Sequence, residues 1–240
     1  GLAQEVIDRL SACGGTLGHV PDPIGVAATI TPVEPTLLKQ VYFDMLRQAK
    51  GIQLHLGTYA YRVKAEKSWI TGVKAVGKGG AREFEAGVYI DATGDGDLAA
   101  LAKLPFSVGR VWDEFSQPMT LLFKMGGVDF DSVRAYVKAH PEQFILVPKG
   151  PDMPYVAISG FFDTVAHAKA AGTLTVNRDR VLLFQGVRPD EAIVNMTRVI
   201  KRSGVSADDL TQAELEARAQ VDEIVRFLRA EVAGFSQSHL

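Results

Sequence analysis

The sequence predicts an α/β fold that carries a small antiparallel meander and is followed by a mixed α+β part. Three observations support this prediction. A short apolar run, a glycine turn and an apolar helical stretch follow one another over residues 87–102, which is the strand–turn–helix order of α/β units. A helical stretch and several alternating stretches precede them. After these residues, short strands and helices mix, and a long amphipathic helix closes the sequence.

Apolar spacing places the elements of the first part. Leu2, Val6 and Leu10 recur every four residues, which indicates a helix. Pro35 suits the first turn of a second helix, and period-two alternation after it indicates strands. In chain order, we expect helices at 2–12 and 35–49, a strand at 52–56, a meander at 59–86 and a buried strand at 88–92.

The same signals continue to the end of the sequence. In chain order, we expect a strand at 117–125, a helix at 131–139, a strand at 154–159, a helix at 163–171, strands at 180–187 and 192–200, and a helix at 212–232. We divide the chain into 1–105, 106–205 and 206–240. The long helix of the last part is expected to pack back on the first part.

Composition narrows the class of protein. The 26 basic and 28 acidic residues are scattered and give a net charge of −2, so we expect no nucleic-acid partner. No apolar run approaches the ~20 residues of a membrane span, and no signal peptide is recognisable, so we expect no membrane partner. The single cysteine, Cys13, is typical of a reducing compartment, and we expect a cytoplasmic protein.

The glycine turn allows more than one interpretation. Gly94 to Ala99 match the G-x-G-x-x-G/A pattern of dinucleotide-binding turns. However, the carboxylates of Asp95 and Asp97 beside the glycines would repel the phosphates that such a turn receives. A calcium loop is also disfavoured, because these two acids and Asp91 lack its ligand spacing.

The third interpretation is a glycine turn that starts a helix. Asp97 would cap that helix, its carboxylate accepting a hydrogen bond from the N–H of Ala99 or Ala100. Gly94 would let the backbone approach a ligand closely, because it has no side chain. The sequence leaves both the structural role and the ligand-binding role open.

Five stretches together resemble a known family. They are DATGDGDLAALA at 91–102, GR at 109–110, QPMTLLFKMGGVD at 117–129, NMTRV at 195–199 and LTQAELEARAQVDEIVRFLR at 210–229. With them the chain resembles a bacterial group of FAD-dependent oxidoreductases within the glutathione-reductase-like, two-dinucleotide-fold flavoproteins. It resembles their middle portion, since neither an N-terminal G-x-G-x-x-G unit nor a C-terminal flavin-binding unit is recognised, and we expect it to be a portion of a longer protein.

The resemblance implies FAD as the cofactor and an incomplete FAD-binding, Rossmann-like domain over residues 1–105. It implies that the backbone of one strand, at about Ala60, contacts the edge of the adenine. It also implies that the glycine turn lies beside the pyrophosphate and ribose. The cofactor-binding residues that it implies are Ala60, Ala92, Thr93, Gly94 and Asp95.

The resemblance also implies a substrate-type domain over 106–205 for a small-molecule substrate. Arg110 and Gln117 flank the passage into that domain, where they face the flavin or the substrate. Asn195 and Arg198 lie on a predicted strand and point to opposite faces, so only one can line a pocket, and we favour Arg198. The sequence assigns no metal site and no catalytic residue.

Two alternatives to this oxidoreductase remain open. The missing fingerprint is compatible with a cofactor-free binding or interaction module on a flavoprotein scaffold. It is equally compatible with a subunit whose FAD site is completed by flanking segments or by a separate chain. In the oxidoreductase interpretation, the isolated chain is expected to be inactive.

Overall fold

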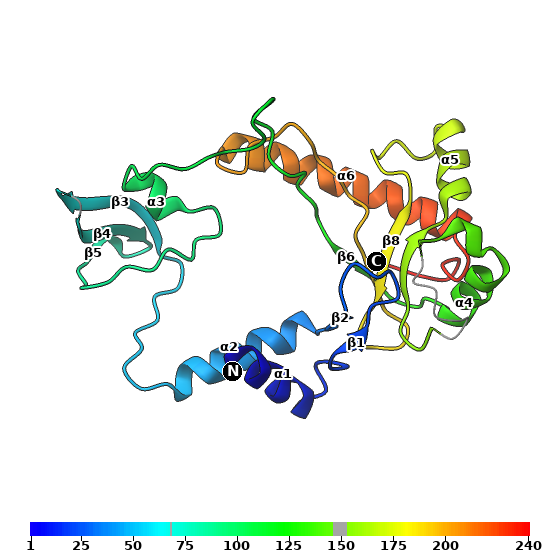
Figure 1. Ribbon diagram of the computed structural model, residues 1–240, viewed down its shortest axis with the longest axis horizontal. Helices are drawn as coiled ribbons and strands as arrows, with labels where there is room; N and C mark the ends of the chain where they lie inside the picture. The colour runs from blue at the N-terminus through cyan, green and yellow to red at the C-terminus, as the bar shows by residue number, and fades with distance from the viewer. Residues whose placement is uncertain (68, 146–152) are drawn as a thin grey trace. The chain divides into compact units, whose positions relative to one another are not determined.

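The computed structural model describes residues 1–67, 69–145 and 153–240, so Ser68 of the meander lies outside the described residues. The chain forms two compact units (Figure 1). The sheet unit comprises 1–49, 118–202 and 210–240, and the meander unit comprises 50–117 and 203–209. Both units are discontinuous in sequence, unlike the linear division into 1–105, 106–205 and 206–240.

Most expected elements form near their expected places. The helices are α1 (Leu2–Ala12), α2 (Pro35–Gln48), α3 (Asp97–Leu101), α4 (Phe130–Ala139), α5 (Phe162–Ala170) and α6 (Ala207–Glu231), with a 3-10 turn at Pro141–Gln143. The strands are β1 (Val20–Pro21), β2 (Thr29–Ile30), β3 (Tyr59–Glu66), β4 (Trp69–Gly77), β5 (Gly80–Phe84), β6 (Phe123–Met125), β7 (Ala157–Gly160), β8 (Val181–Gln185) and β9 (Ala192–Val194).

A four-stranded antiparallel sheet is the centre of the sheet unit, with the strand order β6-β9-β8-β7. Alternation along its strands gives it two different faces. Val181 and Leu183 of β8 are fully buried in the main hydrophobic core. Leu182 and Phe184 are only partly buried and line a cavity instead. One face therefore builds the core, and the other is available for a ligand.

Helix α6 packs on the core face of this sheet (Figure 1). Ile224, Phe227 and Leu228 form its buried stripe and belong to the same core as Val181 of β8. The helix begins at Ala207, five residues earlier than expected. Its buried stripe is therefore used by the four-stranded sheet, whereas the sequence predicted packing on the first part of the chain.

The N-terminal helices join the same unit through a small core and an ion-pair network. Val6 and Leu10 of α1 pack against Val41 of α2. Glu34, the N-cap residue of α2, forms an ion pair with Lys124 of β6. Lys124 Nζ also lies 3.4 Å from a carboxylate oxygen of Glu191, so one lysine links α2 to the sheet.

The meander unit confirms the predicted antiparallel meander. Strands β3, β4 and β5 pair in sequence order, with Val63 opposite Val73 and Val73 opposite Phe84. Helix α3 packs against β3. The whole chain thus mixes helices with antiparallel sheets, and no helix among the described residues is long and apolar enough to span a membrane.

Two predicted strands do not form. Residues 52–56 and 88–92 are irregular, and the second segment leaves Val88 77% and Ile90 84% exposed. A buried parallel strand needs hydrogen-bonding neighbours on its edges. Every strand pairing among the described residues is antiparallel and none includes these two segments. The prediction of a buried strand at 88–92, which as part of an α/β unit would lie in a parallel sheet, is therefore wrong for this structure.

The ion-pair network makes the stability of the sheet unit pH-dependent. The hydrogen bond from Lys124 lowers the pKa of Glu34. Burial alone would lower the pKa of Lys124, but its hydrogen bond to Glu34 and the nearby charge of Glu191 raise it. The network therefore stabilises the fold between these two pKa values, and acid or strong base removes that stabilisation.

Replacing Lys124 with Gln should lower the free energy of unfolding at neutral pH by about 1–2 kcal/mol, because a half-buried pair is partly screened by water. The difference from the wild type should shrink as the pH falls through the lowered pKa of Glu34, which lies below the ordinary value of 4.5. Urea unfolding at several pH values measures this. The matched control is Lys39→Gln on the exposed face of α2, and equal effects from both variants would contradict the prediction.

Candidate functional site

The glycine turn between residues 91 and 97 has the backbone geometry that only glycine adopts easily. Gly94 has φ +93° and Gly96 has φ +75°, and Gly96 is the N-cap residue of α3. A Cβ built on either glycine would meet no atom within 4 Å. The glycines are therefore required by the turn itself, and the space in front of the turn is open.

Asp91 organises this turn. Its Oδ1 accepts hydrogen bonds from the N–H and the hydroxyl of Thr93, at 3.1 and 2.7 Å. Its Oδ2 accepts from the N–H of Ala99 at 3.0 Å, and Thr93 Oγ1 accepts from the N–H of Asp97 at 2.8 Å. The hydrogen bonds from Thr93 and Ala99 lower the pKa of the Asp91 carboxyl.

The prediction that Asp97 caps α3 is therefore wrong. Asp97 is already the first helical residue, and the N-cap residue Gly96 has no side chain to offer. A capping side chain must come from a non-helical residue so that its oxygen can reach the free N–H groups of the first turn. Asp91, six residues before the helix, satisfies that requirement.

Three N–H groups of the turn remain available. Within the described part of the chain, no residue accepts a hydrogen bond from the N–H of Gly94, Asp95 or Gly96. Together with the exposed Asp95 carboxylate, these donors fit the hydroxyl groups of a ribose. A pyrophosphate fits them less well, because the segment that carries them also carries the three acidic residues Asp91, Asp95 and Asp97.

The predicted adenine contact lies in the same unit as the turn. Ala60 is in β3, opposite Ala75 of β4, and α3 packs against β3. The structure therefore gathers Ala60 and the turn residues 92–95 into the meander unit.

Two of the three predicted substrate residues, Arg110 and Gln117, also belong to the meander unit. Arg110 donates from Nε to Asp113 at 3.0 Å and lies over the ring of Trp112 at 5.3 Å. Its charge is therefore already paired with a carboxylate. Gln117 is exposed at the end of the unit.

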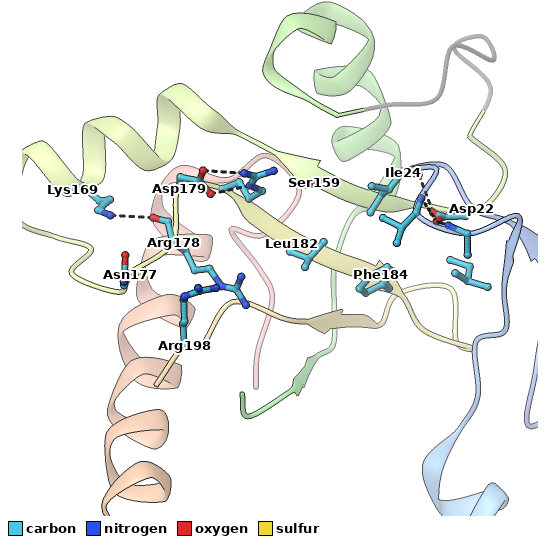
Figure 2. A pocket seen from close by; sticks show the side chains of 14 residues that line it. Asp22, Ile24, Ser159, Lys169, Asn177, Arg178, Asp179, Leu182, Phe184 and Arg198 are labelled. Atoms are coloured by element: carbon cyan, nitrogen blue, oxygen red, sulfur yellow. Dashed lines mark hydrogen bonds and ion pairs between the residues drawn. The ribbon is translucent and has the colours of Figure 1, made fainter. Parts of the chain in front are cut away.

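The third predicted residue, Arg198, lines a cavity of about 750 Å³ on the open face of the sheet (Figure 2). Leu182 and Phe184 of β8 form its apolar floor, and the loop of residues 22–30 contributes an apolar wall that includes Ile24. Asn195 does not line this cavity, and its buried Oδ1 has no hydrogen-bond partner among the described residues.

A buried carboxylate shapes the cavity wall. Asp22 is only 8% exposed and accepts hydrogen bonds from the N–H groups of Ile24, Val26 and Ala27 at 2.9, 2.9 and 3.0 Å. Burial raises the pKa of Asp22, but these backbone donors outweigh it and the net pKa is lowered. Burial and the nearby Asp22 charge raise the pKa of Tyr155 to about 12.

The opposite end of the cavity is cationic. Arg178 donates from Nε to the carbonyl of Met196 at 3.3 Å, while Arg180 pairs with Asp179 at 2.8 Å. Burial and the neighbouring positive charge of Arg198 lower the pKa of Arg178. Figure 2 shows the Arg178 and Arg198 side chains next to each other.

Sequence reasoning missed Arg178. The only signal was the closely spaced run Asn177-Arg178-Asp179-Arg180, which leads into the predicted strand at 180–187. In addition, no group of at least three His, Cys, Asp or Glu side chains in the described ranges could hold a metal ion.

Comparison with known families agrees with the resemblance seen in the sequence. The model of the family described as FAD dependent oxidoreductase matches residues 1–240. The chain therefore belongs to the FAD-dependent oxidoreductase family, whose cofactor is FAD. Neither the curated proteins nor the solved structures gave a match to the chain.

The hydrogen bonds of Asp91 predict how the turn responds to mutation and acid. Asp91→Ala should speed amide hydrogen exchange at Ala99 and Asp97. Asp95→Ala should not, since among the described residues the Asp95 side chain forms no hydrogen bond of the turn. Because the pKa of Asp91 is lowered, its protection of Ala99 should persist below the ordinary value of 3.8 and disappear as the pH falls through the lowered pKa. Equal exchange in both variants would show that Asp91 does not hold the turn.

Proposed function

We propose that this chain is the portion of an FAD-dependent oxidoreductase that contributes the ribose side of the cofactor site and the substrate cavity. The family match over the whole chain carries the proposal. When bound, FAD supplies the hydride or electron transfer to a small-molecule substrate, and the protein supplies binding, orientation and electrostatics.

The turn between residues 91 and 97 contributes to cofactor binding through its backbone. The free N–H groups of Gly94, Asp95 and Gly96 donate to cofactor oxygens, and the Asp95 carboxylate accepts from ribose hydroxyls. Ala92 and Thr93 are small enough to leave the backbone accessible. The Asp91 hydrogen bonds fix this arrangement before the cofactor arrives, so little conformational entropy is lost on binding.

The backbone of Ala60 contributes the contact to the adenine edge in this proposal. The substrate is held on the other unit, where Arg198 lines the cavity. Gln117 and Arg110 are further proposed substrate contacts, although Arg110 would first have to release Asp113.

A further polypeptide segment completes the cofactor site in this proposal. Residues 88–92 form an apolar run, yet Val88 and Ile90 are exposed and no described residue pairs with the run. A parallel strand beside this run, with a crossover helix on the face of the sheet, would bury both side chains. The glycine loop and helix N-terminus that follow such a strand supply hydrogen-bond donors to the phosphates, without the acidic side chains of the turn at 91–97. The segment belongs either to the same polypeptide or to a separate subunit.

A cofactor-free binding module is the second candidate, and the three carboxylates of the turn favour it. Absorbance spectra of the purified 240-residue chain after incubation with FAD and desalting test it. Retained flavin bands would exclude the cofactor-free module. They would also show that no completing segment is needed.

The direct test of the proposal uses Gly94→Val in the natural full-length protein. The branched side chain would occupy the open space in front of the turn, so FAD affinity should fall by at least about tenfold. The matched control is Gly51→Val in the same unit, where φ is +82° and the space is equally open. Fluorescence titration with FAD measures both affinities. Unchanged affinity in Gly94→Val, or an equal loss in both variants, would contradict cofactor binding at this turn.

A further inference from the structure

The cavity on the open face of the sheet has an excess of positive charge. Its lining includes four cationic side chains and only two carboxylates. Both carboxylates are already used within the protein. Asp22 accepts from three backbone N–H groups, and Asp179 pairs with Arg180. Asp179 also acts electrostatically on Arg178, but the two carboxylates together leave the four cations of the lining in excess.

Two guanidinium groups carry this unbalanced charge. In the part of the chain that the structure describes, Arg178 has one acceptor, the neutral carbonyl of Met196, and the Arg198 side chain has none. The two positive charges lie near each other. After burial, the charge of Arg198 is the next largest cause of the lowered pKa of Arg178. Like charges held together in a partly desolvated cavity destabilise a protein, and an anion between them removes that cost.

The backbone of both arginines is held in place. Gln220 of α6 accepts from the Arg198 N–H at 2.7 Å and donates to its carbonyl at 3.2 Å. Lys169 at the end of α5 donates to the carbonyl of Arg178 at 3.1 Å. Two planar guanidiniums on a fixed backbone present parallel N–H donors, which is the geometry that carboxylate and phosphate oxygens accept.

The rest of the cavity lining indicates the chemistry of the part of the ligand away from the arginines. Leu182 and Phe184 form an apolar floor, and Ile24 lies on the facing loop (Figure 2). Ser159, opposite Leu182 in the sheet, and Asn177, next to Arg178 in the chain, offer polar groups. A free inorganic ion would leave the apolar part of this volume unfilled, so the lining favours an organic anion with an apolar body.

We propose that this cavity binds a small organic anion, with its carboxylate or phosphate head between Arg178 and Arg198 and its apolar body on Leu182 and Phe184. That this anion is the substrate rests on the proposed flavin function. The binding itself does not depend on that function.

Isothermal titration calorimetry on the purified chain tests the proposal with three probes that share a hexyl tail: heptanoate, hexyl phosphate and hexanol. At least one of the two anions should bind more tightly than hexanol, and the tighter anion identifies the head group. Arg198→Gln should weaken its binding by about tenfold or more, because a charge-assisted hydrogen-bonding group is lost. Arg218→Gln is the matched control, since it removes the same charge from an exposed ion pair on α6.

A second variant keeps the test valid if Arg198→Gln does not fold. Arg178→Lys retains the charge but not the planar fork, and it should weaken anion binding while circular dichroism and thermal unfolding stay close to wild type. The proposal is overturned if neither anion binds more tightly than hexanol, or if Arg198→Gln binds the anion as tightly as Arg218→Gln. If the chain binds the anion but never retains FAD, the proposed anion site is supported and only the proposed flavin function is rejected.

Discussion

Side-chain alternation along β8 is the constraint on which the sheet unit depends. Val181 and Leu183 are committed to the core beneath α6, so Leu182 and Phe184 must face the other side. A shift of one residue in the strand register would exchange the two pairs, exposing core residues and filling the cavity floor. The same register puts the residues before β8, including Arg178, at the edge of the cavity.

Helix α6 connects the core to the chemistry of the cavity. Its apolar stripe, with Ile224 and Leu228, packs on the sheet, and Gln220 on the preceding turns holds the backbone of Arg198. A substitution in the core stripe could therefore alter ligand binding without touching the cavity. In the meander unit, Asp91 has the corresponding role, because it fixes the glycine turn through hydrogen bonds and not through packing.

Apolar spacing and turn residues predicted the elements that depend only on interactions between residues near in sequence. The helices α1 and α2 and the meander follow from apolar spacing and turn residues, and they formed near their predicted places. The strand at 88–92 did not, because an apolar run forms a strand only when a neighbour pairs with it. Arg198 was singled out from its sequence position, but Arg178 was missed, since the cavity joins segments that lie far apart in the chain. The cap was misassigned for a related reason: backbone geometry at Gly96, invisible in the sequence, gives that role to Asp91.

The most direct test of the account is amide hydrogen exchange of the natural full-length protein with and without FAD. The account predicts that FAD slows exchange at the N–H groups of Gly94, Asp95 and Gly96, which no described residue protects. Exchange that is unchanged at these three amides, in a protein that demonstrably retains FAD, would contradict the placement of the cofactor at this turn.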